Sequence, residues 1–102
     1  MVKNRPAQID NLFESIRAHI DSGRYRLSIH ALERQFQRDI QLPDILHTLR
    51  FGWHEKQKTK FDEGFKKWKY AIRGETLNRS PIRIIIAFDD ADMLVITVMN
   101  VL

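Results

Sequence analysis

The segments IRIIIAF (Ile82–Phe88) and MLVITV (Met93–Val98), separated by DDAD (Asp89–Asp92), decide the fold of this chain. Short apolar runs rich in β-branched residues are typical of central strands that are buried on both faces. Aspartate is frequent in turns because its side chain accepts hydrogen bonds from nearby backbone amides. We therefore expect two neighbouring antiparallel strands joined by a tight turn.

The preceding segment extends this sheet. Trp68, Tyr70 and Ile72 alternate with more polar neighbours, which predicts a half-buried strand. Residues 53–59 are polar and alternate loosely, and they are predicted to form a solvent-facing strand. Residues 61–64 are predicted to form a turn and residues 74–81 a loop.

The first half of the chain has helical periodicity. Apolar residues at helical spacing predict a first amphipathic helix: Ile9, Leu12, Phe13, Ile16 and Ile20. Pro6 suits its first turn and Gly23 its C-terminal end. Residues 25–27 are expected to form a short strand or an extended entry, and Ser28 is a plausible N-cap for a second helix. Pro43 is expected to open a third helix that ends at Gly52.

Helices followed by strands define the expected fold class as α+β, with N-terminal helices packed on an antiparallel β-sheet. The 102 residues are enough for one domain, residues 1–102, with a helical part at 5–52 and a sheet part at 53–100. The residues expected in its core are Ile84, Ile86, Val95, Ile96, Leu32, Phe36, Phe13 and Ile16.

Composition limits the function classes. The chain has no cysteine, which excludes disulfides, thiolate catalysis and thiolate zinc sites. Its apolar runs are too short to span a bilayer, and we expect a cytoplasmic protein without a membrane partner. The formal net charge of +4 favours an anionic partner, either nucleic acid or an acidic protein.

One helix face combines a titratable group with two cations. If residues 28–38 are helical, His30, Arg34 and Arg38 lie four residues apart on one stripe. Such a stripe is suited to phosphate, because arginine binds it through a planar fork and histidine moves protons near neutral pH. His30 is the candidate base or acid, and Arg34 and Arg38 are the candidate phosphate clamps. The alternative is an ordinary solvated helix face.

The middle of the chain is rich in lysine and arginine with aromatic residues between them. This mixture is typical of surfaces on which bases stack and phosphates bind. The candidate nucleic-acid-binding residues are Lys56, Lys58, Lys69, Trp68 and Arg73. The alternative is a solvated sheet face with the aromatic residues in the core.

Metal and cofactor sites are not expected. His19, His30, His47 and His54 show no metal-ligand spacing, and the aspartates at 89–92 have the pattern of a turn. Glycine-rich phosphate loops and a glycine-flanked nucleophilic serine are absent from the sequence.

The motif resembles a known family. Ser28-x-His30-Ala31-x-x-Arg34-x-x-x-Arg38-x-Ile40, followed by Asp44-Ile45 and Gly52, resembles the opening signature of domain of unknown function 4258. Lys69-Tyr70-x-Ile72-x-Gly74 and Val95-Ile96-Thr97-Val98 resemble two later strands of that family. The resemblance covers about residues 24–99. At the position after the last strand where family members carry tyrosine, this chain has Met99.

The family is similar in turn to a fold group that includes barnase, colicin-type tRNA nucleases, the RelE and ParE toxins and the MqsR interferase. This resemblance implies a metal-independent endoribonuclease that leaves 2′,3′-cyclic phosphate ends and acts as the toxin of a toxin–antitoxin pair. It adds Tyr70 and Thr97 as candidate catalytic residues by motif position. The implied partners are RNA, free or ribosome-bound, and an acidic or helix-turn-helix antitoxin. The alternatives are a non-catalytic module that binds nucleic acid or an acidic protein, and a ParE-like toxin that inhibits a protein.

Overall fold

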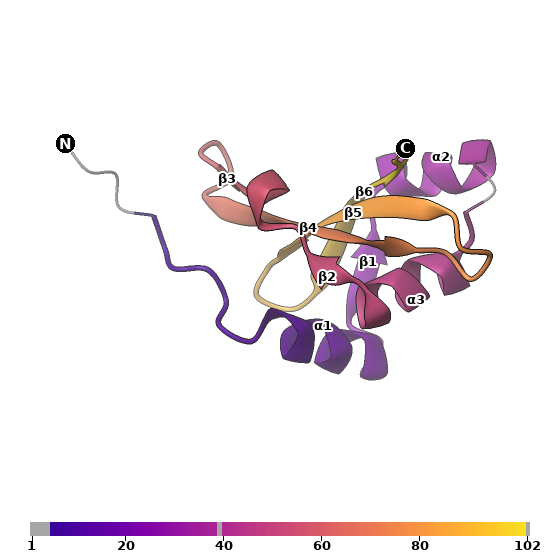
Figure 1. Cartoon of the computed structure of the whole chain (residues 1–102). Coiled ribbons are helices and arrows are strands. Elements are labelled where there is room, and N and C mark those ends of the chain that lie inside the picture. The colour runs from indigo at the N-terminus through magenta and orange to yellow at the C-terminus, as the bar shows by residue number, and fades with distance from the viewer. Residues whose placement is uncertain (1–4, 39, 102) are drawn as a thin grey trace.

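The computed structural model describes residues 5–38 and 40–101, and for Arg38 it describes the backbone alone. Along these residues helices come first and strands dominate the second half (Figure 1). The elements are α1 (Leu12–Asp21), β1 (Tyr25–Leu27), α2 (Ile29–Arg38), α3 (Leu42–Phe51), β2 (Trp53–His54), the 3₁₀-helix η1 (Lys56–Lys58), β3 (Lys60–Asp62), β4 (Lys67–Glu75), β5 (Pro81–Phe88) and β6 (Met93–Asn100).

The strands form one mostly antiparallel sheet in the order β1-β6-β5-β4-β2, and β3 pairs with β4 outside this path. The predicted hairpin is confirmed, because β5 and β6 pair antiparallel with Ile84 opposite Val98. The α+β class is confirmed as well. One pairing was not expected, since β1 lies parallel to β6 with Leu27 opposite Val95. The short strand expected at residues 25–27 is therefore present, and it forms a parallel edge strand of the sheet.

The helices α1 and α3 lie on one face of the sheet, and α2 lies beside the end of β6 (Figure 1). α3 packs on β4 and β5, and α1 packs on α3. Ile16, Ile45 and Leu49 from these helices are fully buried in one core with Ile84 and Val95 from the sheet. Neither α1 nor α3 lies on the opposite face, which we call the open face, and the short 3₁₀-helix η1 borders it with Lys58 (Figure 1).

Two of the expected core residues are exposed, so that part of the prediction is wrong. Phe36 is 90% exposed and Leu32 is 45% exposed, whereas Ala31 is the residue that α2 buries. Ser28 accounts for this difference, because its hydroxyl donates to the Ile96 carbonyl at 2.7 Å and accepts from the Ala31 amide at 3.0 Å. These bonds confirm Ser28 as the N-cap of α2 and bring the small side of the helix, rather than its large apolar side, against β6.

The other expected core residues divide between the two faces. Ile16, Ile84, Ile86 and Val95 are buried as predicted, and Phe13 is half-buried against the core. Ile96 is only half-buried, since a register shift between Ile85 and Ile86 leaves it without an opposite residue on β5. A β-bulge of this kind redirects side chains. The apolar runs are therefore not buried on both faces along their whole length.

Several element boundaries also differ from the prediction. α1 begins at Leu12 and not at Pro6, because the preceding segment is tied to β4. The Trp68 indole N–H donates to the Pro6 carbonyl at 2.7 Å, and the Ile9 amide donates to the Tyr70 hydroxyl at 2.9 Å. Residues 53–59 form the short β2 and η1 instead of one strand, and the predicted turn lies at 63–66.

The ends of α3 agree with the prediction. The helix begins at Leu42 with Pro43 in its first turn, and Gly52 follows its last residue. A Cβ at Gly52 would lie 2.4 Å from the Arg73 carbonyl oxygen, so only glycine allows α3 to approach β4 this closely.

Two alanine substitutions compare the core of the structure with the core expected from the sequence. Ile16→Ala removes a fully buried side chain and is expected to lower the free energy of unfolding by about 2–5 kcal/mol. Phe36→Ala removes an exposed side chain and is expected to change it by less than about 0.5 kcal/mol. Urea unfolding of both variants measures the difference. A larger loss for Phe36→Ala than for Ile16→Ala would contradict this packing.

Candidate functional site

The candidate site lies on the open face, where strand alternation places the charged and half-buried side chains. Tyr70 and Ile72 on β4 are buried on the helical side, while Lys69 between Trp68 and Tyr70 points to the other side. On β5 the buried Ile84 is likewise flanked by Arg83 and Ile85, which are half-buried. Side chains of three neighbouring strands therefore share the face that lies opposite α1 and α3.

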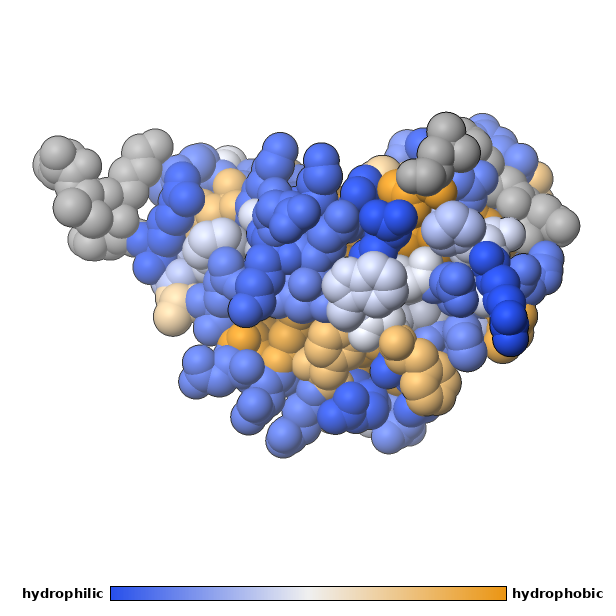
Figure 2. Space-filling model, in the orientation of Figure 1, coloured by the Kyte–Doolittle hydropathy of each residue, from blue (hydrophilic) through white to orange (hydrophobic). Residues whose placement is uncertain are grey.

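A cationic hollow of about 320 Å³ lies on this face. Its lining side chains come from η1, β3, β4, β5 and β6: Lys58, Lys60, Lys69, Arg83, Ile85, Ile96, Thr97 and Met99. Its floor is apolar and its rim is cationic. Figure 2 shows hydrophilic side chains gathered over the region of η1 and β3.

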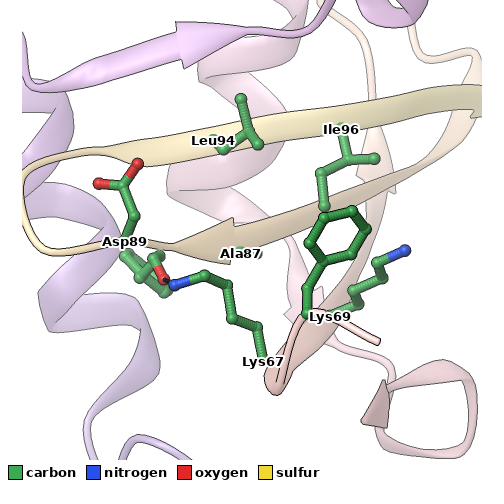
Figure 3. A pocket seen from close by; sticks show the side chains of 8 residues that line it. Lys67, Lys69, Ala87, Asp89, Leu94 and Ile96 are labelled. Atoms are coloured by element: carbon green, nitrogen blue, oxygen red, sulfur yellow. Dashed lines mark hydrogen bonds between the residues drawn. The ribbon is translucent and has the colours of Figure 1, made fainter. Parts of the chain in front are cut away.

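An apolar hollow of about 230 Å³ adjoins it and shares Lys69 and Ile96 with it. Leu94 and Ile96 come from β6 and Ala87 from β5, and Lys67 and Lys69 lie at the end of β4 (Figure 3). The remaining lining residues are Phe65, Phe88 and Asp89. Together the two hollows form a continuous surface that is apolar at one end and cationic at the other.

A half-buried carboxylate, that of Glu55, fixes the arginine of the cationic hollow. Arg83 donates from Nε to Oε1 of Glu55 at 2.6 Å and from Nη2 to Oε2 at 3.1 Å. Arg73 lies 3.6 Å from the same carboxylate. The hydrogen bonds from Arg83, together with the nearby positive charges, hold the pKa of Glu55 below its ordinary value. Arg83 is thus held in one orientation at the edge of the hollow.

The lysines of the hollow differ in how their charge is balanced. Lys69 forms a salt bridge with Asp62 at 2.9 Å, and this contact lowers the pKa of Asp62. Lys58 and Lys60 form no salt bridge with a residue that the structure describes. Their charges are therefore available to an anionic ligand.

His54 helps to place these lysines. Its Nε2 lies 2.8 Å from the Thr59 hydroxyl oxygen, which also accepts from the Ala71 amide at 3.1 Å. This contact ties the segment after η1 to β4. Burial is the main cause that lowers the pKa of His54, and Lys56 adds to it, so both favour the neutral ring. His54 in its neutral form positions the cationic rim without adding a charge to it.

The predicted catalytic residues do not form one cluster. His30 is exposed and Arg34 half-buried on α2, and neither lines the two hollows. Thr97 lines the cationic hollow, whereas Tyr70 is buried on the helical side with its hydroxyl bonded to the Ile9 amide. The side chain of Arg38 lies outside the described residues. The structure therefore places Tyr70 and Thr97 on opposite faces of the sheet.

The predicted nucleic-acid-binding residues are partly brought together. Lys58 and Lys69 line the cationic hollow, and Lys56 is exposed on η1 outside it. Arg73 lies half-buried beside Glu55. Trp68 packs edge-on against Phe61 at 5.3 Å between ring centroids and bonds Pro6, so it anchors the N-terminal segment on the helical side.

Sequence reasoning missed Lys60 and Arg83 as lining residues. Both are visible as cations in the sequence, but the pairing of β3 and β5 with β4 is what places them beside Lys69. It also missed Phe65, because Phe65 lies in a turn and belongs to no helical or strand pattern of apolar residues.

Within residues 5–38 and 40–101, no group of three or more His, Cys, Asp or Glu side chains is arranged to hold a metal ion. None of the helices in these ranges is long and apolar enough to cross a membrane.

The Glu55–Arg83 pair makes stability depend on pH. Because the pKa of Glu55 is lowered by folding, its ionised form stabilises the native state above its ordinary pKa of 4.5. This stabilisation is lost as the pH falls through the lower folded-state pKa. Glu55→Gln is expected to lower the free energy of unfolding at about pH 7 and to differ less from wild type at about pH 3. Urea unfolding at both pH values measures the change.

Glu14→Gln is the matched control, because Glu14 is exposed on α1 and forms no salt bridge with a described residue. A difference between Glu55→Gln and wild type that stays equal at both pH values would argue against this role of the pair.

Comparison with known proteins adds one match. No curated protein and no solved structure matches the chain. The similarity to the RelE and barnase fold group therefore stays a prediction.

A family model, described as Domain of unknown function (DUF4258), matches residues 27–100. This range includes the Ser28–Ile40 motif and the strands β4, β5 and β6, on which the resemblance was based. The match covers well over half of the chain, and the chain therefore belongs to this family.

Proposed function

We propose that this protein binds single-stranded RNA on the open face of its sheet. The observation that supports the proposal most strongly is the cationic hollow, in which Lys58 and Lys60 have no salt bridge with a described residue. Lysine and arginine that neutralise phosphates release counterions, and this release supplies most of the non-specific affinity for nucleic acid. The net charge of +4 acts in the same direction.

The shape of the open face favours a single strand over a duplex. Side chains of η1, β3 and β4 rise beside the floor formed by Ile85 and Ile96, so the cations line a hollow rather than a flat patch. A flexible backbone follows such a surface, and exposed bases can contact its apolar parts.

The salt dependence of binding tests this proposal. Binding to a single strand is expected to weaken linearly with the logarithm of salt concentration, with a slope near −0.7 for each phosphate contact. Lys58→Gln/Lys60→Gln is expected to reduce the magnitude of this slope by about 1.4, because two contacts are lost. Fluorescence anisotropy with a labelled single-stranded RNA at several salt concentrations measures it.

Arg17→Gln/Arg24→Gln is the matched control, since it removes the same charge from exposed positions in and just after α1. Equal slopes for the two double variants would show that the cationic hollow is not the binding surface.

A second candidate function is metal-independent cleavage of the bound RNA. Ser28, Gly52 and Gly74, which belong to the family motif, have structural contacts in this fold. His30 and Arg34 of the same motif form no hydrogen bond or salt bridge with a described residue. Polar residues of a motif without a structural contact are candidates for contact with a ligand.

The proposed chemistry needs no metal. His30 removes the proton from the RNA 2′-OH, the 2′-oxygen attacks the adjacent phosphorus, and the bond from phosphorus to the 5′-oxygen breaks. The 5′-oxygen takes up a proton from water. The product is a 2′,3′-cyclic phosphate and a 5′-hydroxyl end. Arg34 stabilises the negative charge on the phosphorane. Thr97 on β6 lies in the cationic hollow, on the strand against which α2 packs, so RNA in the hollow extends along β6 toward α2.

Removal of His30 tests the cleavage. His30→Ala is expected to lower the rate of RNA cleavage in EDTA by about 10²–10⁴-fold and to leave the stability unchanged, because the side chain is exposed. Gel analysis of labelled RNA measures the rate. His47→Ala on α3 is the control variant. Cleavage by His30→Ala at the wild-type rate would exclude this mechanism, and RNA binding would remain as the function.

We propose further that such an enzyme acts in the cytoplasm as the toxin of a toxin–antitoxin pair. An acidic antitoxin segment, or one attached to a helix-turn-helix protein, is complementary in charge to the cationic hollow. By covering Lys58, Lys60 and Arg83 it would compete directly with RNA.

A further inference from the structure

We propose that the apolar hollow is a subsite for one unpaired nucleobase, next to a phosphate track in the cationic hollow. The inference rests on the proposed RNA binding and names the part of the ligand that each hollow holds. One hollow is apolar and the other is cationic, and the two share Lys69 and Ile96.

The walls of the apolar hollow are almost wholly non-polar. Ala87, Leu94 and Ile96 form the floor, and Phe65 lies at its side. The ring of Phe88 packs against His19 and Tyr70 on the helical side of the sheet. Pockets for drug-sized ligands measure roughly 300–1,000 Å³. A hollow of about 230 Å³ therefore suits a smaller apolar group, such as a single planar ring system.

Phe65 is the feature that points to stacking. Its side chain is 75% exposed, although burial of a phenyl ring is favourable. Phe65 lies in a turn, where its backbone amide donates a hydrogen bond to Oδ1 of Asp62 at 3.0 Å. In the same turn Lys66 adopts a left-handed conformation with φ of 57°. A ring presented by a fixed turn above an apolar floor gives a base two surfaces to contact.

The charges around the apolar hollow favour a nucleotide over an uncharged ligand. Lys67 and Lys69 lie at its edge (Figure 3), and Lys67 Nζ donates to the Phe88 carbonyl at 3.2 Å. Asp89 is the acidic residue among the lining residues, and Arg26 balances it through a contact of 2.7 Å. A ligand that fills both hollows thus carries an apolar ring and, next to it, negative charge. One nucleotide of a single strand meets both requirements.

The test separates binding of the base from binding of the backbone. The probes are a labelled 2′-O-methyl oligoadenylate of about eight nucleotides and an abasic 2′-O-methyl ribose-phosphate oligomer of equal length. The 2′-O-methyl group removes the nucleophile, so cleavage does not disturb the measurement. Fluorescence anisotropy at constant salt gives the dissociation constants.

Phe65→Ala is expected to weaken binding of the oligoadenylate about ten- to a hundredfold and to leave binding of the abasic oligomer unchanged. Phe65→Tyr, which keeps the ring, is expected to bind as wild type does. Phe51→Ala is the matched control, because Phe51 is 74% exposed at the end of α3 and does not line either hollow. Lys58→Gln/Lys60→Gln is expected to weaken both probes by the same factor.

A second variant tests the hollow without touching Phe65. Leu94→Lys places a charge at the half-buried floor of the apolar hollow. This variant is expected to reduce the preference for the oligoadenylate over the abasic oligomer, even though its added positive charge attracts both. Circular dichroism confirms that each variant is folded before binding is measured.

Four results would overturn the inference. Equal affinity of wild type for both probes, or an equal effect of Phe65→Ala on both, excludes the base subsite while RNA binding stands. Absence of binding to either probe at low salt contradicts the proposed function itself. If an acidic peptide that contains phenylalanine binds in a Phe65-dependent way and neither oligomer binds, the surface is a protein interface.

Discussion

Burial of only one face of the sheet is the constraint on which the rest of the structure depends. The alternation of side chains along β4, β5 and β6 sends Ile72, Ile84 and Val95 into the core beneath α1 and α3. The same alternation sends Lys69, Arg83 and Thr97 to the side opposite α1 and α3. A shift of one residue in register would exchange the side chains of the two faces, so the register that buries the core also determines which side chains lie on the open face.

The cations of the open face depend on polar contacts that the sheet itself provides. Glu55 follows β2 and holds Arg83, and Thr59 receives the Ala71 amide while it contacts His54. These contacts use polar side chains to fix the position of η1 and β3, which bear Lys58 and Lys60. A rim that is fixed before the ligand arrives loses less entropy on binding than a set of free lysine side chains.

The sequence was sufficient to predict the long strands β4, β5 and β6, because β-branched runs and alternation are local patterns. β5 and β6, the cap at Ser28 and the end of α3 at Gly52 agree with the structure for that reason. Long-range contacts account for the errors. The apolar side of α2 suggested a core position for Phe36, but hydrogen bonds between Ser28 and β6 bring Ala31 inward instead.

The candidate site was predictable in its chemistry and less so in its geometry. Lys58, Lys69 and Thr97 meet in one hollow, while Tyr70 lies on the other face. Successive side chains of β4 point to opposite faces of the sheet, so Lys69 and Tyr70 are separated although they are adjacent in the motif. The contribution of Arg83 requires the register between β4 and β5, which composition and spacing do not provide.

The central claim is that the open face, and not the helical face, binds single-stranded RNA. Titration of the isotope-labelled protein with a short 2′-O-methyl RNA, followed by amide chemical shifts in two-dimensional NMR, tests it most directly. If RNA binds the open face, the largest changes in amide chemical shift are expected along the cationic hollow, at Lys60, Lys69, Arg83 and Thr97. Shifts confined to α1 and α3, with these amides unchanged, would contradict it.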